Sequence, residues 1–197
     1  MFVSDTNLSE MLEVKLADSE QELEGILILQ QKNLPQNISQ EELQQEGFVT
    51  LEHSMEILSK MNAEAASIIA KDGDEVVGYC LGMTKTFREV FPILVPMFDE
   101  IDSIHYGEGT LESVDYIISG QVCIAKGYRG QGLLGRMYKH YQEVYREKFP
   151  YLITEISARN PRSVRAHEKV GFEVVHTYHV SDPKPEEWII VLWDWNS

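Results

Sequence analysis

A glycine-rich stretch, GYRGQGLLGRM at residues 127–137, has the composition of a loop that holds an anion. It lies between an apolar run that ends at Ile124 and a segment with helical apolar spacing. A glycine turn at the start of a helix directs several unpaired backbone N–H groups at one point, where the helix dipole adds partial positive charge. The expected ligand therefore carries phosphate.

The two residues after Gly132 exclude one phosphate-binding class, the P-loop. Gly127 and Gly132 have the P-loop separation, but Leu133 and Leu134 follow where a lysine and a serine or threonine would contact phosphate and magnesium. This chain lacks the side chains that the P-loop chemistry needs.

A dinucleotide-binding turn is the second alternative. Gly130, Gly132 and Gly135 spell G-x-G-x-x-G, and Glu155 follows the last glycine at the expected interval of about 20 residues. However, residues 125–129 separate the apolar run from the first glycine, and the chain beyond Gly135 is short for the rest of a doubly wound domain. An NAD(P)-binding Rossmann protein is thus the disfavoured alternative.

The elements around the loop predict a mixed α/β chain. Asp72 and Gly73 between two apolar runs indicate a tight hairpin at 66–83, and Pro35 indicates the end of a helix at Leu34. The pattern predicts strands at 12–17, 116–125, 151–157, 172–180 and 186–195, helices at 20–34, 41–45, 51–65, 134–145 and 161–169, and a less regular part at 86–115. We expect one domain over residues 1–197, with a twisted sheet covered by helices on both faces.

Composition limits the partners. The 32 acidic residues against 17 lysines and arginines give a net charge of −15, which disfavours nucleic acid and anionic membranes as partners. No apolar run reaches the roughly 20 residues of a membrane span, and the N-terminal residues do not resemble a secretory signal. We therefore expect a cytoplasmic location, in which Cys80 and Cys123 are buried free thiols.

The loop resembles the acetyl-CoA pyrophosphate loop of the GNAT superfamily of N-acetyltransferases. The pattern of that loop is glutamine or arginine, two residues, glycine, one residue, and glycine or alanine, onto which Arg129, Gly132 and Leu134 fall. Leu134 departs from the last position, and Gly135 follows it directly. The loop works mainly through backbone N–H groups, so a side chain that points away is tolerable.

A second stretch, ARNPRSVRAHEKVGFEVV, resembles another signature of the same superfamily. The positions of that signature are Asn160, Ser163, His167, Lys169, Gly171 and Phe172. Asn160 suits a helix N-cap, Pro161 the first helical turn and Gly171 the residue after the helix. The resemblance covers residues 116–172 well and implies a GNAT-type fold: a mostly antiparallel sheet with a central parallel strand pair splayed for acetyl-CoA.

The resemblance also implies cofactor contacts and a reaction. Acetyl-CoA would be the co-substrate, and the acetyl group would pass directly to a primary amine of a small molecule or peptide. The implied cofactor-binding residues are Val122, Cys123, Ile124, Arg129, Gly130, Gln131, Gly132, Leu133, Leu134, Gly135, Asn160, Ser163 and Lys169. His167 takes the place of a tyrosine that often protonates the leaving thiolate in the superfamily, although it can equally be a packing residue. Tyr138 and Tyr141 are expected in the core.

The base and the acceptor stay open. Glu155, Asp115, and Gln121 with an ordered water are the candidates for the base, and the sequence does not choose among them; Glu155 is named with His167 as a candidate catalytic residue. A stretch without lysine or arginine could favour a cationic acceptor or be a solvated face; its acidic residues are Asp99, Glu100, Asp102, Glu108, Glu112 and Asp115. The neighbouring FPILVPMF could line a pocket, form a homodimer contact or pack in the core.

Two further possibilities are a non-catalytic protein and a metal-binding protein. The missing tyrosine and the irregular Leu134 leave a non-catalytic acyl-CoA sensor as the alternative to an enzyme. We expect no metal site, because His176 and His179 are three apart on a strand and face opposite sides, and the sequence contains no C-x-x-C or H-E-x-x-H motif.

Overall fold

The computed structural model describes residues 12–39, 49, 51–181 and 185–196, and its chain divides into two compact units. Unit 1 comprises residues 1–82 and 120–143, and unit 2 comprises residues 83–119 and 144–197. The strand order is β1-β2-β3-β6-β7-β9-β8, and β6 and β7 form the parallel pair of this mostly antiparallel sheet. The predicted mixed α/β fold is confirmed, while a single domain over residues 1–197 stays a prediction.

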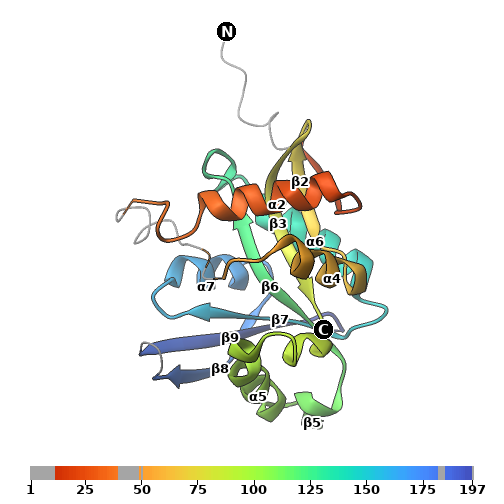
Figure 1. Cartoon of the computed structure of the whole chain (residues 1–197). Coiled ribbons are helices and arrows are strands. Elements are labelled where there is room, and N and C mark those ends of the chain that lie inside the picture. The colour runs from red at the N-terminus through yellow and green to blue at the C-terminus, as the bar shows by residue number, and fades with distance from the viewer. Residues whose placement is uncertain (1–11, 40–48, 50, 182–184, 197) are drawn as a thin grey trace. The chain divides into compact units, whose positions relative to one another are not determined.

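Unit 1 is a layer of strands with helices on both of its faces (Figure 1). Its strands are β1 (Glu13–Leu16), β2 (Ile68–Asp72), β3 (Glu75–Met83, whose last residue belongs to unit 2) and the second half of β6 (Tyr116–Ile124). Its helices are α2 (Glu20–Lys32), α4 (Met55–Glu64) and α6 (Leu133–Tyr145, up to Glu143). Figure 1 shows α2 and α4 in front of β2 and β3, with α6 behind them.

Local sequence explains these elements. The side chains of Ser19 and Ser54 accept hydrogen bonds from backbone N–H groups in the first turns of α2 and α4, so α4 begins later than the predicted residue 51. Asp72 pairs with Glu75, which leaves a two-residue hairpin turn with Gly73 at φ 59°. The helix predicted at 41–45 lies outside the described residues. Tyr138 and Tyr141 are fully buried, as expected.

Unit 2 is built on the other end of β6. It contains β7 (Tyr151–Ser157), β8 (Glu173–Val180) and β9 (Glu186–Asp194), with β9 antiparallel to both β7 and β8. The helix α7 (Pro161–Glu168) connects β7 to β8. The irregular part folds into short elements, namely η1 (Lys85–Arg88), η2 (Pro92–Leu94), α5 (Val95–Ser103), β4 (His105–Tyr106), β5 (Gly109–Thr110) and η3 (Leu111–Ser113).

Candidate functional site

The glycine loop in unit 1 has the geometry of an open cradle. After β6 and the short η4 (Lys126–Tyr128), Gly130 and Gly132 adopt left-handed φ angles of 76° and 77°. A Cβ atom built at either glycine would meet nothing within 4 Å. Because the first N–H groups of α6 have no partner one turn back within the helix, the loop presents backbone donors beside open space.

The side chain of Arg129 braces this loop through hydrogen bonds to Ile124 and Asn33. Its Nε donates to the carbonyl of Ile124 at 2.8 Å, and its guanidinium donates to Oδ1 of Asn33, the C-cap residue of α2, at 2.7 Å. The guanidinium thereby ties the loop to the end of β6 and to α2. This contact was not foreseen from the sequence, where Arg129 was expected to contact the ligand directly.

Further contacts hold the loop and the start of α6 in place. The hydroxyl of Tyr128 donates to Asp72 at the β2–β3 hairpin at 2.7 Å, and the side chain of Gln131 donates to the carbonyl of Gly127 at 2.9 Å. On α6, Arg136 donates to the carbonyl of Leu12 at 2.7 Å. The loop is therefore fixed from several elements of unit 1, although its glycines stay exposed.

The strand β6 leads into the loop and carries the predicted residues Val122, Cys123 and Ile124. Its parallel pairing with β7 covers only the three residue pairs from Tyr116 and Tyr151 to Ile118 and Ile153, whereas β6 continues for six further residues, 119–124. Cys123 is buried, and burial raises the pKa of its thiol to about 12, so the thiol is neutral at pH 7. The predicted free state of Cys80 and Cys123 is confirmed.

A buried polar network that sequence reasoning missed lies between β6 and α2. The side-chain oxygen of Gln121 accepts from the Tyr79 hydroxyl at 2.6 Å and from the Gln30 amide at 2.8 Å. The Gln121 amide donates to the carbonyl of Leu51 at 2.8 Å. Gln30 also donates to Nδ1 of His53, whose pKa burial lowers to about 4.

This network commits Gln121 to the protein. Both lone pairs of its oxygen are used, which leaves little capacity to hold a water for the alternative base mechanism. The signal in the sequence was Gln30, a polar residue that follows Leu23 and Ile26 at helical spacing on the buried face of α2. A buried polar residue at an apolar position requires partners, and here they are His53 and Gln121.

In unit 2, the second predicted signature forms the helix α7 and the residues that lead from it into β8. Asn160 caps α7 by accepting from the N–H of Ser163 at 3.1 Å, as predicted. Nδ1 of His167 donates to the carbonyl of Ser163 at 2.8 Å, and the imidazole packs edge-on against Phe172 at 5.1 Å. Burial lowers the pKa of His167 to about 4, so the imidazole is neutral at pH 7. This environment fits the packing alternative, while Lys169 is exposed at the end of the helix.

Glu155 lies half-buried on β7, and the hydroxyl of Tyr178 on β8 donates to its carboxylate. Burial raises the pKa of Glu155, the Tyr178 hydrogen bond partly offsets this rise, and the resulting pKa is about 7. A carboxylate with a pKa near 7 is suited to accept a proton at neutral pH.

The two predicted catalytic residues lie on opposite faces of the sheet in unit 2. The ring of Phe172 packs against Trp193 at 5.7 Å, and Trp193 is the register partner of Leu152 on β7. Leu152 and Glu155 are three residues apart on the strand, so their side chains point to opposite faces. His167 therefore belongs to the Trp193 face, and the structure does not bring it together with Glu155.

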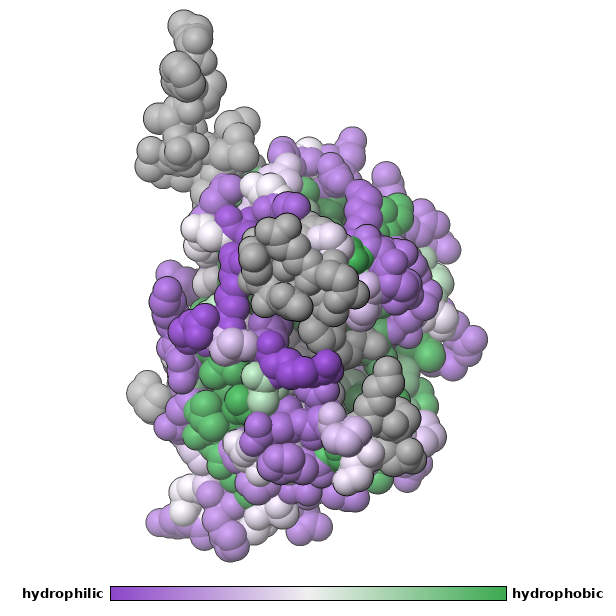
Figure 2. All heavy atoms as spheres, turned by 90° about the vertical axis from the view of Figure 1, so that its left-hand side faces the viewer, coloured by the Kyte–Doolittle hydropathy of each residue, from purple (hydrophilic) through white to green (hydrophobic). Residues whose placement is uncertain are grey.

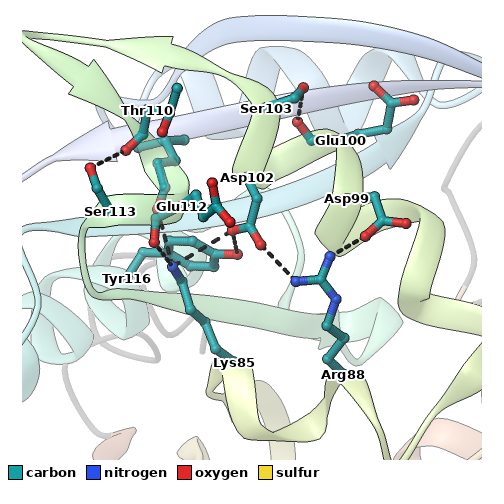
Figure 3. Close-up of polar contacts among 11 residues, drawn as sticks. Lys85, Arg88, Asp99, Glu100, Asp102, Ser103, Thr110, Glu112, Ser113 and Tyr116 are labelled. Carbon is teal, nitrogen blue, oxygen red and sulfur yellow. Dashed lines mark hydrogen bonds and ion pairs between the residues drawn. The ribbon is translucent and has the colours of Figure 1, made fainter.

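Much of the acidic stretch is paired within unit 2. Arg88 donates to Asp102 at 2.7 Å and also pairs with Asp99, while Asp102 accepts from the Tyr116 hydroxyl at 2.9 Å (Figure 3). Lys85 lies 3.6 Å from Asp102 and 4.3 Å from the centre of the Tyr116 ring. In Figure 3, Glu100 extends away from this cluster, and it pairs with His176 on β8 at 2.9 Å. Asp99 and Asp102 thus have cationic partners in unit 2, and Glu100 has a histidine partner, which weakens the argument for a cationic acceptor.

The described surface and helices add two observations. The face drawn in Figure 2 is mostly hydrophilic, with apolar side chains in smaller patches. Among the described residues, no helix has the length and apolarity to cross a membrane, and no group of three or more potential ligands is placed to hold a metal ion.

Together, a mixed sheet with a short parallel ladder and a glycine loop that opens a helix define an acyltransferase-type fold. The family of acetyltransferases named Acetyltransferase (GNAT) matches residues 33–172, and the chain belongs to this family. The sequence matches none of the curated proteins with which it was compared.

Solved structures share the fold at low sequence identity. The ribosomal-protein-S18-alanine N-acetyltransferase of Escherichia coli superposes with a TM-score of 0.60 at 12% identity, over 93% of this chain and 94% of its own. Arabidopsis thaliana NAA60, solved with a bisubstrate analogue, gives 0.63 at 12% identity, over 93% and 97%. The NatC complex bound to Gag peptide and CoA gives 0.62 at 12% identity, over 93% and 98%. These likenesses support the fold.

Proposed function

We propose that this protein transfers the acetyl group of acetyl-CoA to a primary amine of a small molecule or peptide. The observation that carries the proposal is the loop of unit 1, in which two left-handed glycines border open space at the start of α6. In a chain of the GNAT family, such a loop is suited to the diphosphate of acetyl-CoA.

The cofactor would be held mainly by backbone groups. N–H groups of residues 130–135 would bind the diphosphate, and the backbone of residues 122–124, beyond the ladder with β7, would pair with the pantetheine chain. Arg129 would act by bracing the loop through Ile124 and Asn33. Contacts from Asn160, Ser163 and Lys169 are carried over from the family signature and rest on the resemblance alone.

Glu155 would serve as the general base. The amine nitrogen attacks the thioester carbonyl, its proton passes to Glu155, the C–N bond forms, and the C–S bond breaks to release CoA as a thiolate that must take up a proton. The pKa of about 7 leaves a substantial fraction of Glu155 ionised at neutral pH. His167 as the proton donor to the thiolate stays a prediction of the resemblance.

Release of free CoA thiol tests the proposal directly. The protein would be incubated with acetyl-CoA and a panel of small amines, peptides with free N-termini and lysine peptides, with mass spectrometry to detect the acetylated amine. Thiol release with at least one acceptor, lost in Glu155→Gln, is the expected result. Acetyl-CoA binding without turnover on any acceptor would contradict it.

The alternative, a sensor that binds acyl-CoA without turnover, has one observation in its favour. At the signature position where the superfamily often carries a tyrosine, this chain buries a neutral histidine. Under that alternative, calorimetry would register acetyl-CoA binding while thiol release stayed at the level of the buffer.

A further inference from the structure

The hydroxyl of Tyr178 reaches Glu155 across an intervening strand. Glu155 on β7 pairs with Ile190 of β9, and Tyr178 on β8 pairs with Trp188 of the same strand. The strands β7 and β8 are thus two steps apart in the sheet, about 9.5 Å. Only a long side chain bridges this distance, and the Tyr178 hydroxyl donates to Oε2 of Glu155.

Two more residues hold the ring of Tyr178. His176, two residues earlier on β8, stacks on it with an interplanar angle of 12° and 6.4 Å between ring centres. Nε2 of His176 in turn lies 2.9 Å from Oε2 of Glu100 on α5. Tyr178 itself is 8% exposed. The ring is therefore fixed by its own strand and by α5.

From this arrangement we infer that Tyr178 is a positioning residue for the reaction: it fixes the carboxylate of Glu155 through Oε2 and leaves Oε1 to receive the proton of the acceptor amine. His176 and Glu100 hold the Tyr178 ring in the orientation that this requires. The inference rests on the proposed role of Glu155 as the general base.

The electrostatics of this face agree with the geometry. Burial raises the pKa of Glu155, and the Tyr178 hydrogen bond lowers it, with a result of about 7. Tyr178 from β8 contacts Glu155 directly, His176 stacks on Tyr178, and Glu100 from α5 pairs with His176, whereas β9 presents the apolar Ile190 as the register partner of Glu155. Further along, Glu186 pairs with Arg159 beside Ser157. Among the residues that the structure describes in unit 2, Tyr178 is thus the group that stabilises the ionised form of Glu155 by a hydrogen bond.

Replacing Tyr178 with phenylalanine removes the hydroxyl and keeps the ring, so it tests the hydrogen bond separately from the packing of the ring. Because the hydrogen bond favours the carboxylate, its loss raises the pKa of Glu155, and we expect the acidic limb of kcat/KM against pH to move up by about one unit in Tyr178→Phe. Tyr106→Phe is the matched control, since Tyr106 also donates to a glutamate, Glu173, at 2.6 Å, and it should leave the profile unchanged.

The outcomes separate this inference from the proposed function. If Glu155→Gln abolishes thiol release while Tyr178→Phe keeps the wild-type profile, Glu155 remains the base and the positioning role of Tyr178 is refuted. If Glu155→Gln retains full activity, the proposed base itself is wrong. Carbon-13 NMR titration of the Glu155 carboxyl, assigned with Glu155→Gln, gives a readout without turnover: the inference requires a higher pKa in Tyr178→Phe, and an unchanged pKa contradicts it.

Discussion

Substitution of Gly132 by alanine probes whether the loop of unit 1 must keep its left-handed backbone to bind acetyl-CoA. At φ 77° a residue with a Cβ atom is strained by about 1–2 kcal/mol. The new Cβ meets no atom within 4 Å, so packing adds nothing to this cost. The exposed loop of the free variant can relax to another conformation, and binding must then restore the strained one.

This strain converts into affinity. A penalty of about 1–2 kcal/mol weakens acetyl-CoA binding about 5- to 30-fold. Isothermal titration calorimetry of wild type and Gly132→Ala measures the change. Gly135→Ala is the matched control, because Gly135 lies within α6 without a positive φ and its Cβ would also meet open space.

The control has its own expected result. Alanine is favoured over glycine inside a helix by about 1 kcal/mol, so Gly135→Ala should raise the melting temperature by about 2–4 °C and leave the affinity within about twofold. Equal affinity in wild type and Gly132→Ala would refute the reasoning about the left-handed loop. An equal loss of affinity in both variants would instead indicate that the ligand also approaches Gly135 closely. In that case Gly135, and not Leu134, would occupy the last glycine position of the loop pattern.

Two further predictions concern the buried histidines. For His167, the resemblance predicts that His167→Asn, which can still donate to the Ser163 carbonyl, lowers turnover at least roughly tenfold and retains acetyl-CoA affinity. Wild-type turnover in His167→Asn, together with a loss of about 2–4 kcal/mol of stability in His167→Ala, would leave His167 only a packing role. Acid should also destabilise the fold: the pKa values of His53 and His167 are about 4 when folded against 6.5 otherwise, so the unfolded chain binds their protons first, and stability that is full above pH 6.5 falls by up to about 3 kcal/mol for each as the pH approaches 4. Glu155 acts oppositely between pH 4.5 and 7, so urea unfolding should show a net loss between pH 7 and pH 4.5 that is smaller in His53→Gln, and a pH-independent midpoint would contradict the burial of these imidazoles.

The sequence carried most of the architecture because its signals are local. Asp72 and Gly73 predicted the hairpin to within one residue, and Asn160 with Pro161 predicted the start of α7. Apolar alternation likewise located β6 and β7 closely. Such patterns depend only on residues that are neighbours in the chain, and these elements form where the patterns predict them.

The candidate site was harder to predict because its contacts join distant segments. The bracing of Arg129 by Asn33 spans 96 residues, and the bridge from Tyr178 to Glu155 depends on which strand lies between β7 and β8. No spacing rule indicates either contact. Burial also determines which side chain can carry a proton at neutral pH. The sequence offers both His167 and Glu155 for this role, but burial lowers the pKa of His167 and raises the pKa of Glu155.

Location, self-association and the cationic nature of the acceptor stay predictions. The charge argument is weaker than the sequence indicated, because Asp99, Asp102 and Glu100 have partners in unit 2. A comparison of cationic and neutral amines in the thiol-release assay at low and high salt would measure what remains of it.

The most direct test of the central claim is an NMR titration of the 15N-labelled protein with acetyl-CoA. Backbone amides that bind the diphosphate change their chemical shift on saturation, and we predict the largest changes for residues 130–135, with the amides of the Gly73–Asp74 hairpin turn far less affected. Saturable binding that leaves the amides of Gly130, Gly132 and Leu133 unmoved would contradict it.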